Sequence, residues 1–189
     1  MSSESELTDP SSDYDVESTQ ESTSKKRKAK SSSAYVIKDA LKQPSTASYA
    51  TDWLAKQMKT GDIKVDPEYQ RNVVWSDAKQ SKLIDSILRN FYVPPILFCI
   101  SEDSSGNQTR ICIDGKQRLT SIRRFLDGLI PHKDGKMSFY FKQADGTKAV
   151  RLLPEPLRKQ FRNKTLVCIE YRELSPVHER EMFQVRLEG

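Results

Sequence analysis

The junction at residues 113–118 holds the side chains best suited to chemistry. It reads Ile113-Asp114-Gly115-Lys116-Gln117-Arg118, with an apolar strand pattern before it and an apolar helix pattern after it. Gly115 permits a tight turn between the two. The N-terminus of a helix presents unpaired N–H groups and a partial positive charge, so it attracts anions. Lys116 and Arg118 would add two formal charges there, and arginine can bind phosphate oxygens through two parallel hydrogen bonds.

Asp114 and Gln117 have side chains that could act on a bound phosphate. Asp114 could cap the helix, hold a magnesium ion, or position a water molecule beside the phosphate. Gln117 could orient a water molecule or read a base. A capped helix with two solvated cations would have the same spacing, and spacing alone favours that structural interpretation. The junction is neither a Walker A loop nor a G-x-G-x-x-G fingerprint.

A second cluster lies earlier in the chain, where Gln70 and Arg71 end a loop opened by a proline and Trp75 follows. Arg71 could close over the same anion from the opposite side. Alternatively, it is a surface arginine stacked on Trp75.

The elements that must position these residues follow from periodicity and caps. We expect a helix around residues 53–58, ended by Gly61, and a short strand at 63–65. Ser76 is a good N-cap for a helix to about residue 90. Strands at 96–100 and 109–113 should form a hairpin through the turn at 104–107.

A helix with five apolar residues on one face should follow the junction: Leu119, Ile122, Phe125, Leu126 and Leu129. Further on, the pattern predicts a strand at 137–142, a helix at 154–163, a strand at 166–171, and a helix opened by Ser175 and Pro176. This order predicts an α+β domain with one small mixed sheet and packed helices.

Residues 1–33 are rich in Ser, Glu, Asp and Thr and have too few apolar residues to form a core, which predicts a disordered tail. The basic run at 25–30 is typical of a nuclear-import signal, with a non-specific basic arm as the alternative. We therefore expect a eukaryotic source, a nuclear or cytoplasmic location, and a folded domain over residues 34–189.

Composition narrows the classes of function. The longest apolar run has eight residues, so we expect no membrane-spanning helix and no membrane partner.

The chain has 31 basic and 26 acidic residues. Without the seven acids of residues 1–24 and the five bases of 25–30, the remainder carries a net charge of +7. That charge suits a polyanion, although it could serve solubility alone. Three cysteines inside apolar runs predict buried thiols. With two histidines and no Cys-x-x-Cys pair, the sequence does not predict a zinc site.

Four segments in order resemble the N-terminal domain of GmrSD-type restriction endonucleases, a branch of the ParB/sulfiredoxin-like superfamily. They are residues 65–75 (VDPEYQRNVVW), 82–88 (KLIDSIL), 93–96 (VPPI) and 113–120 (IDGKQRLT). The resemblance covers about residues 48–189. It is strongest to the fungal branch, which adds Trp53-Leu54 and Phe91-Tyr92. The segment at residues 183–189 departs from the family pattern, which suggests either a chain truncated at the C-terminus or a degenerate copy.

The resemblance implies that the loop and helix at the junction bind a nucleoside triphosphate with Mg²⁺, and that NTP hydrolysis accompanies restriction of modified DNA. Gly115, Lys116 and Arg118 would then hold phosphates, Asp114 would position Mg²⁺ or water, and Gln117 would orient the reactants. Gln70 and Arg71 would complete the pocket. DNA cleavage would need a separate His-Asn-His nuclease domain, which this sequence does not contain.

Two other functions stay open at this point. One is a non-enzymatic nuclear DNA-binding or adaptor protein, favoured by the net +7 charge and the import-like run. The other is a metal-dependent nuclease that uses carboxylates such as Asp66, Glu68, Asp85 and Asp114, although Asp85 is more typical of a structural hydrogen bond. The sequence does not indicate the oligomeric state.

Overall fold

The computed structural model describes residues 35, 37–38, 40–65, 75–146 and 149–185. The elements below belong to the unit Asp39–Gly189. The predicted tail, its import-like run, and the loop with Gln70 and Arg71 lie outside the described residues.

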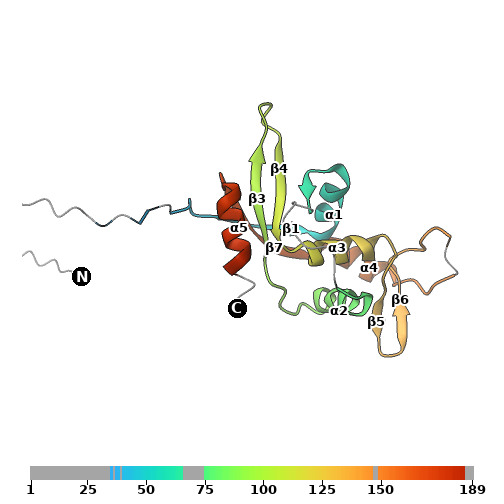
Figure 1. Ribbon diagram of the computed structural model, residues 1–189. Coiled ribbons are helices and arrows are strands. Elements are labelled where there is room, and N and C mark those ends of the chain that lie inside the picture. Colours follow the sequence, from blue (N-terminus) through green and yellow to red (C-terminus); the bar gives the residue numbers. More distant parts are fainter. Residues whose placement is uncertain (1–34, 36, 39, 66–74, 147–148, 186–189) are drawn as a thin grey trace, which may run out of the picture. The chain divides into compact units, whose positions relative to one another are not determined.

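A five-stranded sheet with the order β1-β7-β3-β4-β2 forms the centre of this unit (Figure 1). Its strands are β1 (Ser45–Ala50), β2 (Ile63–Lys64), β3 (Ile96–Glu102), β4 (Gln108–Asp114) and β7 (Thr165–Arg172). The β1–β7 and β3–β4 pairs are antiparallel, whereas β3–β7 and β2–β4 are parallel. The sheet is therefore mixed, and the α+β prediction is confirmed. A separate hairpin joins β5 (His132–Asp134) to β6 (Met137–Phe139).

Five helices occur in the described part of the chain: α1 (Thr51–Thr60), α2 (Asp77–Leu88), α3 (Lys116–Leu126), α4 (Glu155–Asn163) and α5 (Pro176–Val185). Their ends follow local chemistry, as expected. Gly61 ends α1 in the left-handed conformation, with φ of +89°. The Ser76 hydroxyl accepts a hydrogen bond from the Lys79 N–H and caps α2. Ser175 caps α5 by accepting from the His178 N–H at 3.3 Å.

One hydrophobic core joins one face of the sheet to helices α1 to α4. Alternate residues of β3, including Ile96, Phe98 and Ile100, pack there with Leu119 and Phe125 of α3. On the other side of β3 and β4 lies α5 (Figure 1). The cysteines at positions 99, 112 and 168 are buried free thiols, as predicted. In the described residues, no helix is both long and apolar enough to cross a membrane.

Two short strands were not predicted, and their sequences explain why. β1 reads Ser-Thr-Ala-Ser-Tyr-Ala, which has no alternation of apolar and polar residues. Its position at the sheet edge comes from pairing with β7, more than a hundred residues away. β5 reads His-Lys-Asp and is equally polar. The predicted strand at 137–142 is reduced to Met137–Phe139.

One residue predicted for the core face of α3 lies elsewhere. Leu129 is 53% exposed because α3 ends at Leu126 and the chain turns at Gly128, where φ is +76°. The helical spacing that placed Leu129 beside Phe125 therefore does not extend to it.

Candidate functional site

Gly115 makes the turn between β4 and α3 that the sequence predicted. It occupies the N-cap position with φ of +119°, a conformation that L side chains rarely adopt. A Cβ atom at this position would lie 2.9 Å from Cγ2 of Ile96 in the neighbouring strand β3. Glycine is therefore required both by the backbone angle and by the packing, and it lets α3 begin directly at the edge of the core.

Arg118 lies in the first turn of α3 with a side chain that is only 9% exposed. Its Nη2 donates to the carboxylate of Asp114 and, at 3.2 Å, to the backbone carbonyl of Pro95. Its Nε is buried and has no hydrogen-bond partner among the described residues. Burial lowers the pKa of the guanidinium, while the nearby Cys112 thiol and Tyr92 phenol act in the opposite direction. The Nε–H group of the buried Arg118 guanidinium could therefore donate a hydrogen bond to an anion.

Asp114 ends β4 and forms an ion pair with Arg118, four residues later. Its side chain is 19% exposed. The described residues contain no group of three or more His, Cys, Asp or Glu side chains that could hold a metal ion. Mg²⁺ in phosphoryl-transfer sites is commonly bound by one or two carboxylates together with substrate phosphates, so a single Asp114 fits a magnesium ion that arrives with a nucleotide. The carboxylate would then be shared between Arg118 and the metal.

Lys116 and Gln117 complete the first turn of α3, and the Lys116 side chain is largely buried. The Oε1 atom of Gln117 accepts a hydrogen bond from the Trp75 N–H at 3.2 Å. The carbonyl of Trp75 in turn accepts from Nε2 of Gln80 in α2 at 2.9 Å. These bonds tie α3 to Trp75 and, through it, to α2.

The structure brings together five of the seven predicted site residues, at positions 114–118, around one helix N-terminus. Gln70 and Arg71 lie outside the described residues, so a closing role for Arg71 and its stacking on Trp75 both stay predictions. Lys79 is the described cation over the Trp75 ring, with Nζ 4.6 Å from the ring centroid.

Two features of the site were missed in the sequence. The Pro95 carbonyl orients Arg118, and only the fold brings the segment before β3 beside α3. Tyr92 is 83% exposed and close enough to influence the Arg118 guanidinium. Two consecutive prolines after an aromatic pair were a signal for a rigid segment here, but not for its neighbour.

The carboxylates proposed for a nuclease give that function little geometric support. Asp85 accepts a hydrogen bond from Nε of Arg89 at 2.9 Å and lies 3.6 Å from Nδ1 of His132, in keeping with the structural role predicted for it. Asp114 is paired with Arg118, and Asp66 and Glu68 lie outside the described residues. Each described carboxylate of the set is therefore already paired with an arginine.

The fold and the site define a small α+β domain with a mixed sheet and a cationic junction between a central strand and a helix. A sequence model of the family described as "GmrSD restriction endonuclease, N-terminal domain" matches residues 51–186. Because this match covers more than half of the chain, the chain belongs to that family. No curated protein and no solved structure matches the chain in the corresponding comparisons. The resemblance read from the four segments is thus confirmed at the level of the family, and a fungal source stays a prediction.

Proposed function

We propose that this domain binds a nucleoside triphosphate at the N-terminus of α3 and acts together with nucleic acid. The observation that carries the proposal is the buried Arg118 guanidinium, whose Nε has no partner in the part of the chain that the structure describes. A cation held in a poorly hydrated place is stabilised by a bound anion, and a helix N-terminus supplies further N–H donors. The family's connection with restriction endonucleases supports the nucleic-acid part of the proposal.

The chain's own residues would divide the work as follows. Gly115 makes the turn at which the first N–H groups of α3 would face a phosphate, and Lys116 and Arg118 would balance the phosphate charge. Asp114 would orient Arg118 and provide a ligand for the magnesium ion that accompanies the nucleotide. Magnesium would neutralise phosphate charge. Gln117, fixed by the Trp75 N–H, would position a water molecule, and Gln70 with Arg71 would close the pocket.

Hydrolysis would be a second step at the same site. Phosphoryl transfer depends mainly on positioning and on neutralising developing charge. The cations of α3 could provide the neutralisation and Asp114 the orientation. Binding without turnover would still let the domain act as a nucleotide-dependent switch.

A thermal-shift series with the four NTPs, each with and without Mg²⁺, tests the binding step. A ligand that binds only the folded state raises apparent stability by about 1.4 kcal/mol for each tenfold excess over Kd, so saturable, magnesium-linked shifts are expected. Arg118→Lys keeps a cation beside Asp114 but removes the Nε donor, and it should weaken binding at least tenfold. Arg89→Ala removes an exposed arginine at the C-cap of α2 and should leave the shift unchanged.

The absence of a shift with every NTP would contradict the proposal. So would an equal loss of binding in Arg118→Lys and Arg89→Ala. A second variant, Lys116→Ala, tests the site without removing the Asp114 ion pair, so a folding defect in one variant does not decide the result.

The second candidate is a non-enzymatic DNA-binding or adaptor protein in the nucleus. The net charge of +7 over residues 31–189 favours it. Such a protein would bind DNA without any NTP, with an affinity that falls steeply as salt rises. Comparing DNA affinity with and without NTP and Mg²⁺ separates the two candidates.

A further inference from the structure

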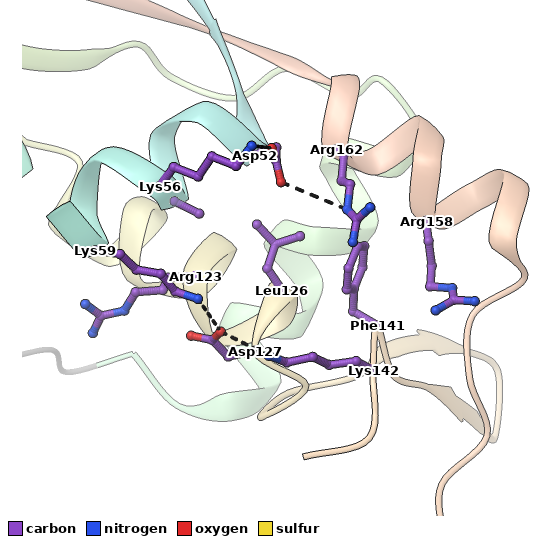
Figure 2. Close-up of a pocket in the computed structure, with 11 residues that line it drawn as sticks. Asp52, Lys56, Lys59, Arg123, Leu126, Asp127, Phe141, Lys142, Arg158 and Arg162 are labelled. Atoms are coloured by element: carbon purple, nitrogen blue, oxygen red, sulfur yellow. Dashed lines mark ion pairs between the residues drawn. The ribbon is translucent and has the colours of Figure 1, made fainter. Parts of the chain in front are cut away.

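A cavity of about 240 Å³ opens among α1, α3 and α4, and most of its polar side chains are cationic (Figure 2). Six cationic residues line it: Lys56 and Lys59 of α1, Arg123 of α3, Lys142, and Arg158 and Arg162 of α4. These residues come from four separate parts of the sequence. The fold therefore gathers positive charge that the sequence leaves dispersed.

Two carboxylates in the cavity are each shared between two cations, as Figure 2 shows. Asp127 lies 3.4 Å from Nζ of Lys59 and 3.5 Å from Nζ of Lys142. Asp52 lies 2.8 Å from Nζ of Lys56 and 4.0 Å from Nε of Arg162. The lining residues therefore keep an excess of four positive charges. Glu155, outside the lining, balances one of them by pairing with Arg158.

Two arginines of the cavity have hydrogen-bonding capacity that the protein does not use. The Arg123 side chain is half-buried and has no hydrogen-bond or ion-pair partner among the described residues. Nε of Arg158 is buried and likewise lacks a partner in the described part of the chain. Buried donors are normally satisfied, so Nε of Arg158 indicates a ligand with anionic oxygens, and the half-buried Arg123 adds a second cation for such a ligand.

Helix stability explains part of this arrangement, but not all of it. Lys59, Arg123 and Arg162 lie in the last turns of their helices, where a cation stabilises the helix through its dipole. That effect acts on each helix separately. It does not account for Lys56 and Arg158, or for the meeting of the cations around one cavity. Mutual repulsion among them is a cost that a polyanion would relieve.

We propose that this cavity binds the phosphates of a DNA duplex. Long lysine and arginine side chains around a hollow suit sugar–phosphate contacts, which supply most non-specific DNA affinity. The proposal rests on the nucleic-acid part of the proposed function and names its surface. Arg123 lies five residues after Arg118, which is about 8 Å along α3 and about 140° around it, so the two sites are distinct.

The test measures binding of a short labelled duplex to the full chain as a function of salt, by fluorescence anisotropy. Each phosphate contact removed should lower the slope of log K against log salt by about 0.9. Arg123→Gln combined with Arg158→Gln should therefore reduce the slope by nearly two and weaken binding at low salt at least tenfold. Lys133→Gln, on the exposed β5 strand, is the matched control for the loss of one charge and should have little effect.

The same variants are tested for the NTP thermal shift and for binding to phosphatidylserine vesicles. Retention of the NTP shift with loss of DNA binding supports the cavity as the DNA surface. If the chain shows no NTP shift but its DNA binding depends on the cavity, the inference is also supported. Only the nucleotide proposal is then contradicted. Loss of the NTP shift with unchanged DNA binding would overturn the inference, as would cavity-dependent binding to vesicles but not DNA. DNA binding reduced no more than in Lys133→Gln would overturn it as well.

Discussion

Gly115 carries two separate constraints at the residue scale. Its φ of +119° disfavours any L side chain, and its neighbour Ile96 leaves no room for a Cβ atom. Gly106, in the turn between β3 and β4, has φ of +81° but nothing within 4 Å of a Cβ position. Substitution of Gly106 therefore measures the cost of the backbone angle alone, whereas substitution of Gly115 adds the cost of the clash with Ile96.

We expect Gly115→Ala to lower the free energy of unfolding by about 2–4 kcal/mol, because backbone strain adds to overpacking against β3. Gly106→Ala should cost about 1–2 kcal/mol from the backbone alone. Urea denaturation followed by circular dichroism measures both. Equal costs in the two variants would show that the contact with Ile96 is relieved by a small shift.

A polar network ties three strands together at the element scale. Nε of Arg110 in β4 donates to Oε1 of Glu170 in β7 at 2.9 Å, and the Tyr49 hydroxyl in β1 donates to the same oxygen at 2.7 Å. The Arg110 and Glu170 side chains are 14% and 8% exposed. Tyr49 stacks on Trp53 of α1, with ring centroids 4.2 Å apart. The network thus links the edge strand to the sheet centre and to α1.

Arg110→Met should destabilise the fold by about 3 kcal/mol, because it leaves the Glu170 carboxylate buried without its cation. Arg110→Met with Glu170→Leu should recover a large part of the loss, since the unpaired charge is then gone. The comparison is made by urea denaturation against Arg89→Met, which breaks an exposed pair on α2 and should cost less than about 1 kcal/mol. A double variant no more stable than Arg110→Met would contradict this explanation.

Two buried thiols make the stability of the whole molecule depend on pH. Burial raises the pKa of the Cys168 thiol from its ordinary value near 9.0 to about 12. Burial and a hydrogen bond with Glu179 raise the pKa of Cys99 to about 11. Above pH 9 the unfolded chain therefore releases protons that the folded chain keeps. Because the pKa of each thiol is higher in the folded chain, each thiol stabilises the folded state fully below pH 9. This contribution to stability is lost as pH rises toward 11 or 12.

Stability should consequently fall between pH 9 and 11 by about 1.4 kcal/mol per pH unit for each of the two thiols. Urea midpoints at pH 8, 9 and 10 measure the fall. Cys168→Ala removes one titrating group and should make the pH dependence shallower, even though it also lowers stability at pH 8. An unchanged slope in that variant would show that other groups cause the alkaline loss.

Local sequence was sufficient for much of the fold. Ser76 and Gly61 marked helix ends correctly, since a cap acts through atoms within a few residues of it. The Asp-Gly-x-Gln-Arg segment predicted the β4–α3 junction, since the need for glycine at a sharp turn is also local. Pairing in the sheet was less visible. The polar strand β1 is defined by β7 rather than by its own residues.

The sequence by itself determined the class of fold, the glycine turn and the positive residues at the start of α3. Only the tertiary structure decided that Arg118 is buried against Asp114 and the Pro95 carbonyl, and that cations of α1, α3 and α4 surround one cavity. The physical reason is distance along the chain. Caps and helical periods act over about four residues, whereas burial and the meeting of charges depend on packing between segments that the sequence keeps far apart.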